Sequence, residues 1–219
     1  ACCHNPTGVD LTAEQWQALL EVLREYELLP FLDVAYQGFS RGIDEDGTVV
    51  RQFAQSGMPL LIANSFSKSF SLYGERVGAL TIIDSSKDES TRVLSQLKRV
   101  IRANYSTPPT HGGSVVTTVL TTPELRDSWV QELTEMRERI KHMRSALVDR
   151  LQAHGANRDF SFVLRQNGMF SYSGLTAAQV DRLREEFHIY AVSTGRICGA
   201  ALNSRNVDYV AKAITTVLQ

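Results

Sequence analysis

The chain has 219 residues, of which 43% are hydrophobic and 21% charged, a balance typical of a globular protein and not of a disordered or fibrous one. Lys and Arg number 23 against 24 Asp and Glu, so the formal net charge is -1 and no overall positive charge exists to hold a nucleic acid or an anionic membrane. We therefore expect no nucleic-acid partner, and no apolar run approaches the roughly 18 to 20 residues of a membrane span.

The cysteine content and the start of the chain also carry information. Cys2, Cys3 and Cys198 are too few, and of the wrong parity, for a disulfide framework, which favours a reducing, cytoplasmic location. The cluster Cys2-Cys3-His4 lacks the usual spacing of metal ligands, so we predict no metal site. The chain opens on Ala1, and its first residues look like the end of a buried strand entering a turn. We expect the natural protein to begin upstream.

The first part of the chain predicts an α/β layer. Leu and Val at helical spacing predict a helix over 11–29, with Thr12 and Gln15 as a capping box. Apolar runs that end in polar loops predict strands, the first of them buried on both faces as parallel strands are, and a short helix is expected near 48–56. The predicted strands are 28–36, 59–66 and 76–84. Strands that alternate with helices in this way are typical of α/β proteins.

The second part predicts a smaller α+β domain. A helical pattern over 87–104 ends in a Pro- and Gly-rich break, and residues 123–154 are amphipathic over an unusual length. Such a helix often bridges two domains, so we place a boundary near Met136, between domains 1–135 and 136–219. Beyond it we expect strands at 160–164, 168–174 and 189–192, and helices at 176–188 and 206–218.

The segment from Ser65 to Ser71 is the most informative for chemistry. It places Lys68 among small hydroxyls between two apolar strands, with Arg76 shortly after. A lysine held there beside a second cation would be partly desolvated, which suits Schiff-base chemistry, while Ser65, Ser67 and Arg76 would suit a phosphate. A solvated serine-rich loop with an ordinary surface lysine is an equally good interpretation of the pattern alone.

Asp33 and Tyr36 follow the first predicted strand. A carboxylate at the carboxyl end of a buried strand lies where open α/β sheets bind ligands, and it could hold a proton on a heterocyclic nitrogen. A lone Asp is more often a turn former, however. The Tyr36 hydroxyl could donate to a phenolate, although a tyrosine packed against a loop is about as common.

Four further residues are weaker candidates. Asn5 lies in an Asn-Pro turn, and most such turns have no further role. Arg102 and Arg196 could each grip a carboxylate with two parallel hydrogen bonds, but surface arginines are more often solvated or salt-bridged. Phe170 could form the wall of a site, or pack in a core at strand spacing.

Taken together, these motifs resemble the fold-type I, pyridoxal-phosphate-dependent aminotransferases, in particular the aspartate and aromatic amino-acid aminotransferase family. The resemblance covers essentially the whole chain, which corresponds to about the C-terminal half of such an enzyme. It implies the C-terminal part of a large cofactor-binding domain, with a mostly parallel sheet, and a small C-terminal α+β domain. The motifs that carry it are HNPTG (4–8), DVAYQGF (33–39), NSFSKSFSLYGERVG (64–78), IRANYSTPP (101–109), QNGMFSYSGL (166–175) and TGR (194–196).

The resemblance also implies a role for each candidate residue. Lys68 would form the Schiff base with pyridoxal phosphate and then transfer the substrate proton, and Asp33 would pair with the ring nitrogen. Arg196 would hold the substrate α-carboxylate, and Arg102 would reach the side-chain carboxylate across a homodimer interface. Tyr36 and Asn5 would bond the phenolate oxygen of the cofactor, and Phe170 would form a wall of the active site. The cofactor phosphate would be held by Ser65, Ser67 and Arg76.

The implied reaction is ping-pong transamination between an aromatic or acidic L-amino acid and a 2-oxo acid such as 2-oxoglutarate. The sequence departs from the family pattern at Thr107, where Asn is usual, and at Cys198 in the segment after Arg196. These departures bear on the contacts around Arg196 and on the face between subunits. The preference between aspartate and aromatic substrates stays open, because family members that take aromatic substrates keep the arginine that corresponds to Arg102 and move it aside. Two alternatives are the aminotransferase-like domain of a transcriptional regulator and a non-catalytic fragment, because half of an enzyme is expected to be inactive alone.

Overall fold

The computed structural model describes all residues, 1–219, and its internal contacts divide them into two compact units. The first unit holds Ala1 and Leu11–Leu133, and the second holds Cys2–Asp10 and Thr134–Gln219. Helix α6 (Pro123–Ala153) contributes residues to both units, since the division falls between Leu133 and Thr134. The grouping of Cys2–Asp10 with the second unit differs from a single cut near Met136.

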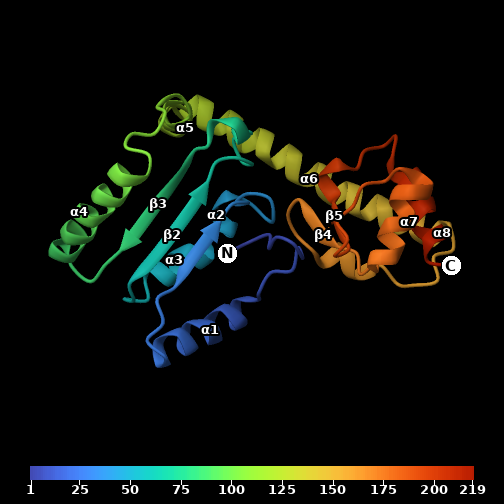
Figure 1. Ribbon diagram of the computed structural model, residues 1–219, viewed down its shortest axis with the longest axis horizontal. Helices are drawn as coiled ribbons and strands as arrows, with labels where there is room; N and C mark the ends of the chain where they lie inside the picture. Colours follow the sequence, from blue (N-terminus) through green and yellow to red (C-terminus); the bar gives the residue numbers. More distant parts are fainter. The chain divides into compact units, whose positions relative to one another are not determined.

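The first unit is built on a three-stranded sheet with the order β1-β2-β3, shown in Figure 1. Strands β1 (Phe31–Val34) and β2 (Leu60–Ser65) are parallel, whereas β2 and β3 (Gly78–Ile83) are antiparallel. The sheet is therefore mixed and not mostly parallel as expected. The link from β2 to β3 contains only a short 3-10 helix (Tyr73–Glu75), and a parallel connection needs a longer crossover, usually a helix.

Two helices cover one face of this sheet. Helix α1 (Ala13–Glu25) starts at the predicted capping box, in which Gln15 N donates to Thr12 Oγ1 and Thr12 N donates to Gln15 Oε1. Helix α3 (Thr48–Ala54) follows the short helix α2 (Ile43–Asp46). A cluster of buried apolar side chains joins α1, α3 and the strands β1 and β2. Its buried members are Leu20, Leu32, Val34, Phe53, Leu60 and Ile62.

The opposite face of β1 is open. Burial alternates along the strand, and the side chain of Phe31 is 63% exposed. The prediction of a strand buried on both faces is therefore wrong, since α1 and α3 cover one side only. Helices α4 (Lys87–Asn104) and α5 (His111–Thr121) follow β3 along the chain, and α4 has the bounds that the sequence pattern predicts.

The second unit packs three helices around a short ribbon. Strands β4 (Phe170–Tyr172) and β5 (Arg196–Cys198) are antiparallel, and helices α7 (Ala177–Phe187) and α8 (Val207–Val217) are where we expected them. The core joins α6, α7 and α8 and contains, among others, Leu147, Leu151, Val180, Leu183 and Ile214.

Three predicted strands in this region do not form. Residues 161–165 are a 3-10 helix, because the Asp159 carboxylate accepts bonds from both the N–H and the hydroxyl of Ser161 and so favours a turn. The run 189–192 is irregular, and Val192 instead closes the turn that leads into β5, by accepting from Gly195 N. The first residues of the chain are not a strand either, although Cys3 is buried there.

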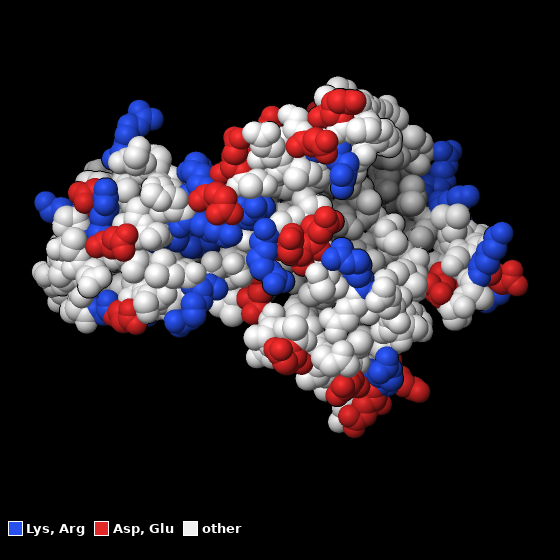
Figure 2. Space-filling model, turned by 180° about the vertical axis from the view of Figure 1, so that it is seen from behind, with Lys and Arg blue, Asp and Glu red and all other residues white.

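No helix in the structure is both long and apolar enough to cross a membrane. On the face drawn in Figure 2, Lys and Arg side chains are interspersed with Asp and Glu, as the near-zero net charge leads one to expect.

Candidate functional site

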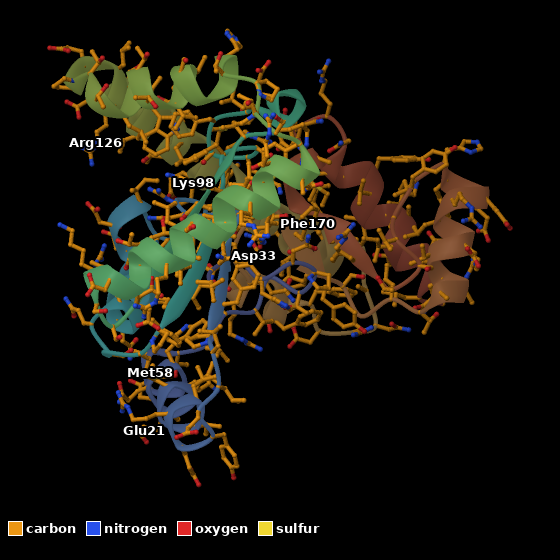
Figure 3. All side chains as sticks on the ribbon, turned by 60° about the vertical axis from the view of Figure 1, so that its left-hand side comes forward. Glu21, Asp33, Met58, Lys98, Arg126 and Phe170 are labelled. Atoms are coloured by element: carbon orange, nitrogen blue, oxygen red, sulfur yellow. The ribbon has the colours of Figure 1, made fainter.

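Asp33 and Tyr36 lie at the carboxyl end of β1, next to the end of β2. Asp33, labelled in Figure 3, is opposite Ala63 in the parallel register, and Ala63 comes two residues before Ser65. Asp33 is exposed and lies on the face of the sheet that α1 and α3 do not cover. Tyr36 comes two residues after the strand ends, and its side chain is only 7% exposed. The structure thus places both residues at the sheet edge where open α/β proteins bind ligands.

The loop after Tyr36 is folded around a buried carboxylate that we did not predict. Asp46 Oδ2 accepts hydrogen bonds from Gly38 N (2.8 Å) and Ser40 N (3.0 Å), and Oδ1 accepts from Arg41 N (3.0 Å). Asp46 is 4% exposed, so these three bonds replace the water that an ionised carboxylate needs. Phe39 N also donates to Tyr36 O, which leaves the main chain around Tyr36 with little freedom.

Lys68 lies in a turn directly after β2. Phe70 N donates to Phe66 O (3.2 Å), Ser71 N donates to Lys68 O (3.2 Å), and Ser67 N donates to Ser65 Oγ (3.2 Å). The turn points the Lys68 ammonium at the ring of Tyr36, with Nζ 4.7 Å from the ring centroid. Two residues that the sequence singled out for different roles, one from each strand end, are therefore brought together.

Arg76 lies at the start of β3, at the end of the sheet where β2 finishes. Ser65 is opposite Gly78 in the antiparallel register, so Arg76 is two residues away from that pair. Its backbone is left-handed, with φ of 52°, and one guanidinium nitrogen donates to Tyr73 O at 2.8 Å. The side chain remains exposed. Ser65, Ser67 and Arg76 therefore offer hydroxyl and guanidinium donors at the same sheet edge as Lys68.

In the second unit, the structure brings Asn5, Phe170 and Arg196 together. Arg196 Nη1 donates to Asn5 Oδ1 at 2.8 Å, and the guanidinium carbon lies 4.6 Å from the centroid of the Phe170 ring. The Asn5 turn is attached to this unit because Asn167 N donates to Gly8 O and Asn167 Nδ2 donates to Asp10 Oδ2. The weak candidates Asn5, Arg196 and Phe170 thus form one group.

A buried arginine supports the strand that carries Phe170. Arg144 on α6 is 3% exposed; its Nε donates to Ser171 Oγ (3.1 Å), and its Nη2 donates to Phe170 O (3.1 Å) and to Gly168 O. Burial lowers the pKa of the Arg144 guanidinium below its usual value, since the charged form loses water. We did not predict this residue, because an arginine in an amphipathic helix usually lies on the exposed face.

Arg102 makes only a local contact among the bonds described. It lies in the last turn of α4, is exposed, and donates from Nη1 to Ser106 Oγ at 2.5 Å. The structure of this chain does not join it to the Lys68 and Tyr36 group.

Comparison with known proteins identifies the family. Residues 1–214 match the sequence model of the family described as aminotransferase class I and II. The chain belongs to this family of enzymes. It is 66% identical over 218 residues to an aspartate aminotransferase of Pseudomonas aeruginosa, a match that covers 100% of this chain. It is 54% identical over 217 residues to the aromatic-amino-acid aminotransferase of Escherichia coli, a match that covers 99% of this chain.

A solved structure shows the same fold at high similarity. The aromatic-amino-acid aminotransferase from Burkholderia pseudomallei, covalently bound to pyridoxal phosphate, superposes with a TM-score of 0.97 at 67% identity over 100% of this chain. The predicted resemblance to this family and the predicted α/β fold class are confirmed. This chain spans about half the length of these relatives, 55% in each case.

Proposed function

We propose that this aminotransferase chain carries the catalytic lysine of a pyridoxal-phosphate-dependent transaminase. Its reaction exchanges an amino group between an aromatic or acidic L-amino acid and a 2-oxo acid such as 2-oxoglutarate. The observation that carries the proposal is the position of the Lys68 amine, 4.7 Å from the ring of buried Tyr36, at a sheet edge that also presents Asp33. The names of the relatives support an aminotransferase and not a transcriptional regulator.

The donor groups fit pyridoxal phosphate. The cofactor carries an aldehyde, a phosphate, a phenolate and a pyridine nitrogen, and the chain offers an amine, a set of hydroxyls with a guanidinium, a phenol and a carboxylate. Lys68 offers the amine, Tyr36 the phenol and Asp33 the carboxylate. The hydroxyls and the guanidinium belong to Ser65, Ser67 and Arg76, and all six residues lie in the first unit. Bound pyridoxal phosphate supplies a conjugated ring that withdraws electrons from the substrate Cα.

Each side chain then has a defined task. The Asp33 carboxylate would accept a hydrogen bond from the ring nitrogen and would keep a proton there, which maintains the electron withdrawal. The Lys68 amine would hold the cofactor through its aldehyde and would move the proton of the substrate Cα, as general base and then as general acid. The Tyr36 hydroxyl donates to the phenolate oxygen.

The substrate carboxylate is assigned to Arg196. Its guanidinium is already oriented by the bond to Asn5 Oδ1 and by the face of Phe170, and a planar guanidinium can bind a carboxylate with two parallel bonds. Arg102 is assigned to the side-chain carboxylate of an acidic substrate bound by a second subunit, because it is exposed and has only a local partner here.

The proposal includes an assembly and a location. The active protein is a homodimer in the cytoplasm, with residues 1–135 in the large cofactor-binding domain and 136–219 in the small domain. The low number of cysteines supports a reducing compartment, and the exposed Arg102 supports a contribution to a neighbouring subunit.

The test uses a complete polypeptide, in which these 219 residues are joined to the part of the Pseudomonas aeruginosa relative that they do not match. We expect Lys68→Ala to abolish transamination of both aspartate and phenylalanine, because the proposal assigns both the link to the cofactor and the transfer of the Cα proton to the Lys68 amine. The matched control is Lys98→Ala in α4, which should react at the parent rate. Turnover by Lys68→Ala at the parent rate would contradict the proposal.

A further inference from the structure

The turn that carries Lys68 is held from a distance by one residue of α6. The indole Nε1 of Trp129 donates to Ser69 O at 2.7 Å, across 60 positions of sequence. The other bonds described for this turn are local and come from Ser65, Val77 or the turn itself. Trp129 therefore connects the residue directly after Lys68 to a helix that neither the sequence motif nor the proposed chemistry involves.

Aromatic stacking strengthens this connection. The ring of Phe70 stacks on Trp129 with centroids 4.6 Å apart and an interplanar angle of 23°, and Phe66 meets the edge of Phe70 at 5.5 Å. Phe66 and Phe70 lie two residues before and two residues after Lys68. Ser67 and Ser69, the direct neighbours of Lys68, are both buried. The turn is thus fixed on both sides of the lysine.

We propose that Trp129 is a positioning residue for Lys68, which keeps its amine directed at Tyr36. The proposal rests on the proposed function only for its catalytic consequence, since the fixed turn is a property of the chain itself. Without the indole N–H, the carbonyl of Ser69 loses its partner and the turn opens more often. The Lys68 amine then spends less time where the cofactor aldehyde would meet it.

Tryptic cleavage of the folded 219-residue chain after Lys68 tests the fixed turn directly, because trypsin cleaves that bond only when the turn opens. The variant Trp129→Phe keeps an aromatic ring and removes the N–H. We expect it to raise the cleavage rate at Lys68–Ser69 about threefold to tenfold, the equivalent of one hydrogen bond, while cleavage after Arg102 in α4 keeps its parent rate. The matched control is Trp16→Phe, whose ring meets the edge of Phe53 in the core of the same unit.

A second measurement concerns the chemistry. In the complete polypeptide, borohydride reduction at limiting pyridoxal phosphate should label Lys68 about threefold to tenfold less in Trp129→Phe than in Trp16→Phe. Equal cleavage and equal labelling in these two variants would overturn the inference. If the parent protein takes no label at Lys68, the proposed function fails, while the cleavage rates still decide whether Trp129 holds the turn.

The variant Phe70→Leu covers the case in which Trp129→Phe does not fold. It removes the ring that stacks on Trp129 and leaves the indole N–H and the carbonyl of Ser69 in place. The inference expects faster cleavage after Lys68 in this variant too, with cleavage after Arg102 unchanged. A parent rate at Lys68 in the folded Phe70→Leu protein would count against the role of Trp129.

Discussion

At the scale of single residues, Asp46 shows how a side chain outside the motifs determines the place of one inside them. Its two oxygens accept three backbone N–H groups from the loop that follows Tyr36, in a buried position. An amide in the same place has one acceptor oxygen and turns an N–H group toward a donor. The loop, and Tyr36 with it, depends on the second carboxylate oxygen.

Asp46→Asn should therefore lower the free energy of unfolding by about 2 kcal/mol, the range expected when a hydrogen bond to a charged group is lost. Asp44→Asn, two residues away and exposed, is the control and should change it by less than about 0.5 kcal/mol. Urea denaturation of the 219-residue chain measures both. Similar unfolding free energies for the two variants would show that the buried bonds do not stabilise the loop.

The candidate site residues and the residues that support them differ in how far the sequence predicts them. Lys68, Asp33 and Tyr36 are recognisable because their chemistry lies in the side chain and their motifs are specific. Asp46, Trp129 and Arg144 act on backbone groups that come close only after folding, and nothing in their local sequence marks those partners. Such supporting residues follow from the structure alone.

At the scale of helices and strands, long periodic segments are predictable and short apolar runs are not. Helix α4 has its predicted bounds because the pattern repeats over five turns and Ser86 caps it by accepting from Glu89 N. The strands at 160–164 and 189–192 were wrong because a few apolar residues fit a turn as well as a strand. Side-chain bonds from Asp159 and the turn before β5 decide between the two.

Gly8 gives a prediction at this scale, since it lies at the end of the Asn5 turn and its backbone packs closely against Phe170 of β4. Its φ is 71°, and a Cβ there would lie 2.6 Å from the carbonyl oxygen of Phe170. Gly155 has a similar φ of 77° but no atom within 4 Å of the same position. We expect Gly155→Ala to lower the free energy of unfolding by about 1 kcal/mol, because only the left-handed backbone conformation opposes a Cβ there. We expect Gly8→Ala to lower it by about 3 kcal/mol, because the main chain must also move to make room for the Cβ. Equal losses in urea denaturation would contradict this account.

At the scale of the whole chain, an apolar face of the sheet remains uncovered. Phe31 is 63% and Leu80 is 51% exposed, and the register places them on the face that α1 and α3 do not cover. An apolar surface of this kind favours association when it is left in water.

The 219-residue chain should accordingly self-associate as its concentration rises, and the double variant Phe31→Lys, Leu80→Glu should do so much less. Tyr190→Lys removes a more exposed aromatic ring from the second unit and is the control, with association expected at the parent level. Sedimentation velocity over a concentration series measures this. A monomeric parent chain at all concentrations would show that the open face is not adhesive.

The central claim is that Lys68 is the cofactor lysine, and the most direct measurement is borohydride reduction with pyridoxal phosphate followed by peptide mass mapping. Reduction makes any lysine adduct permanent, so the map reports which amine reacted. Our account predicts a single labelled site at Lys68 in the complete polypeptide, with Lys87 and Lys98 unlabelled and with no label in Lys68→Ala. Labels spread over several lysines, or no label at Lys68, would contradict it.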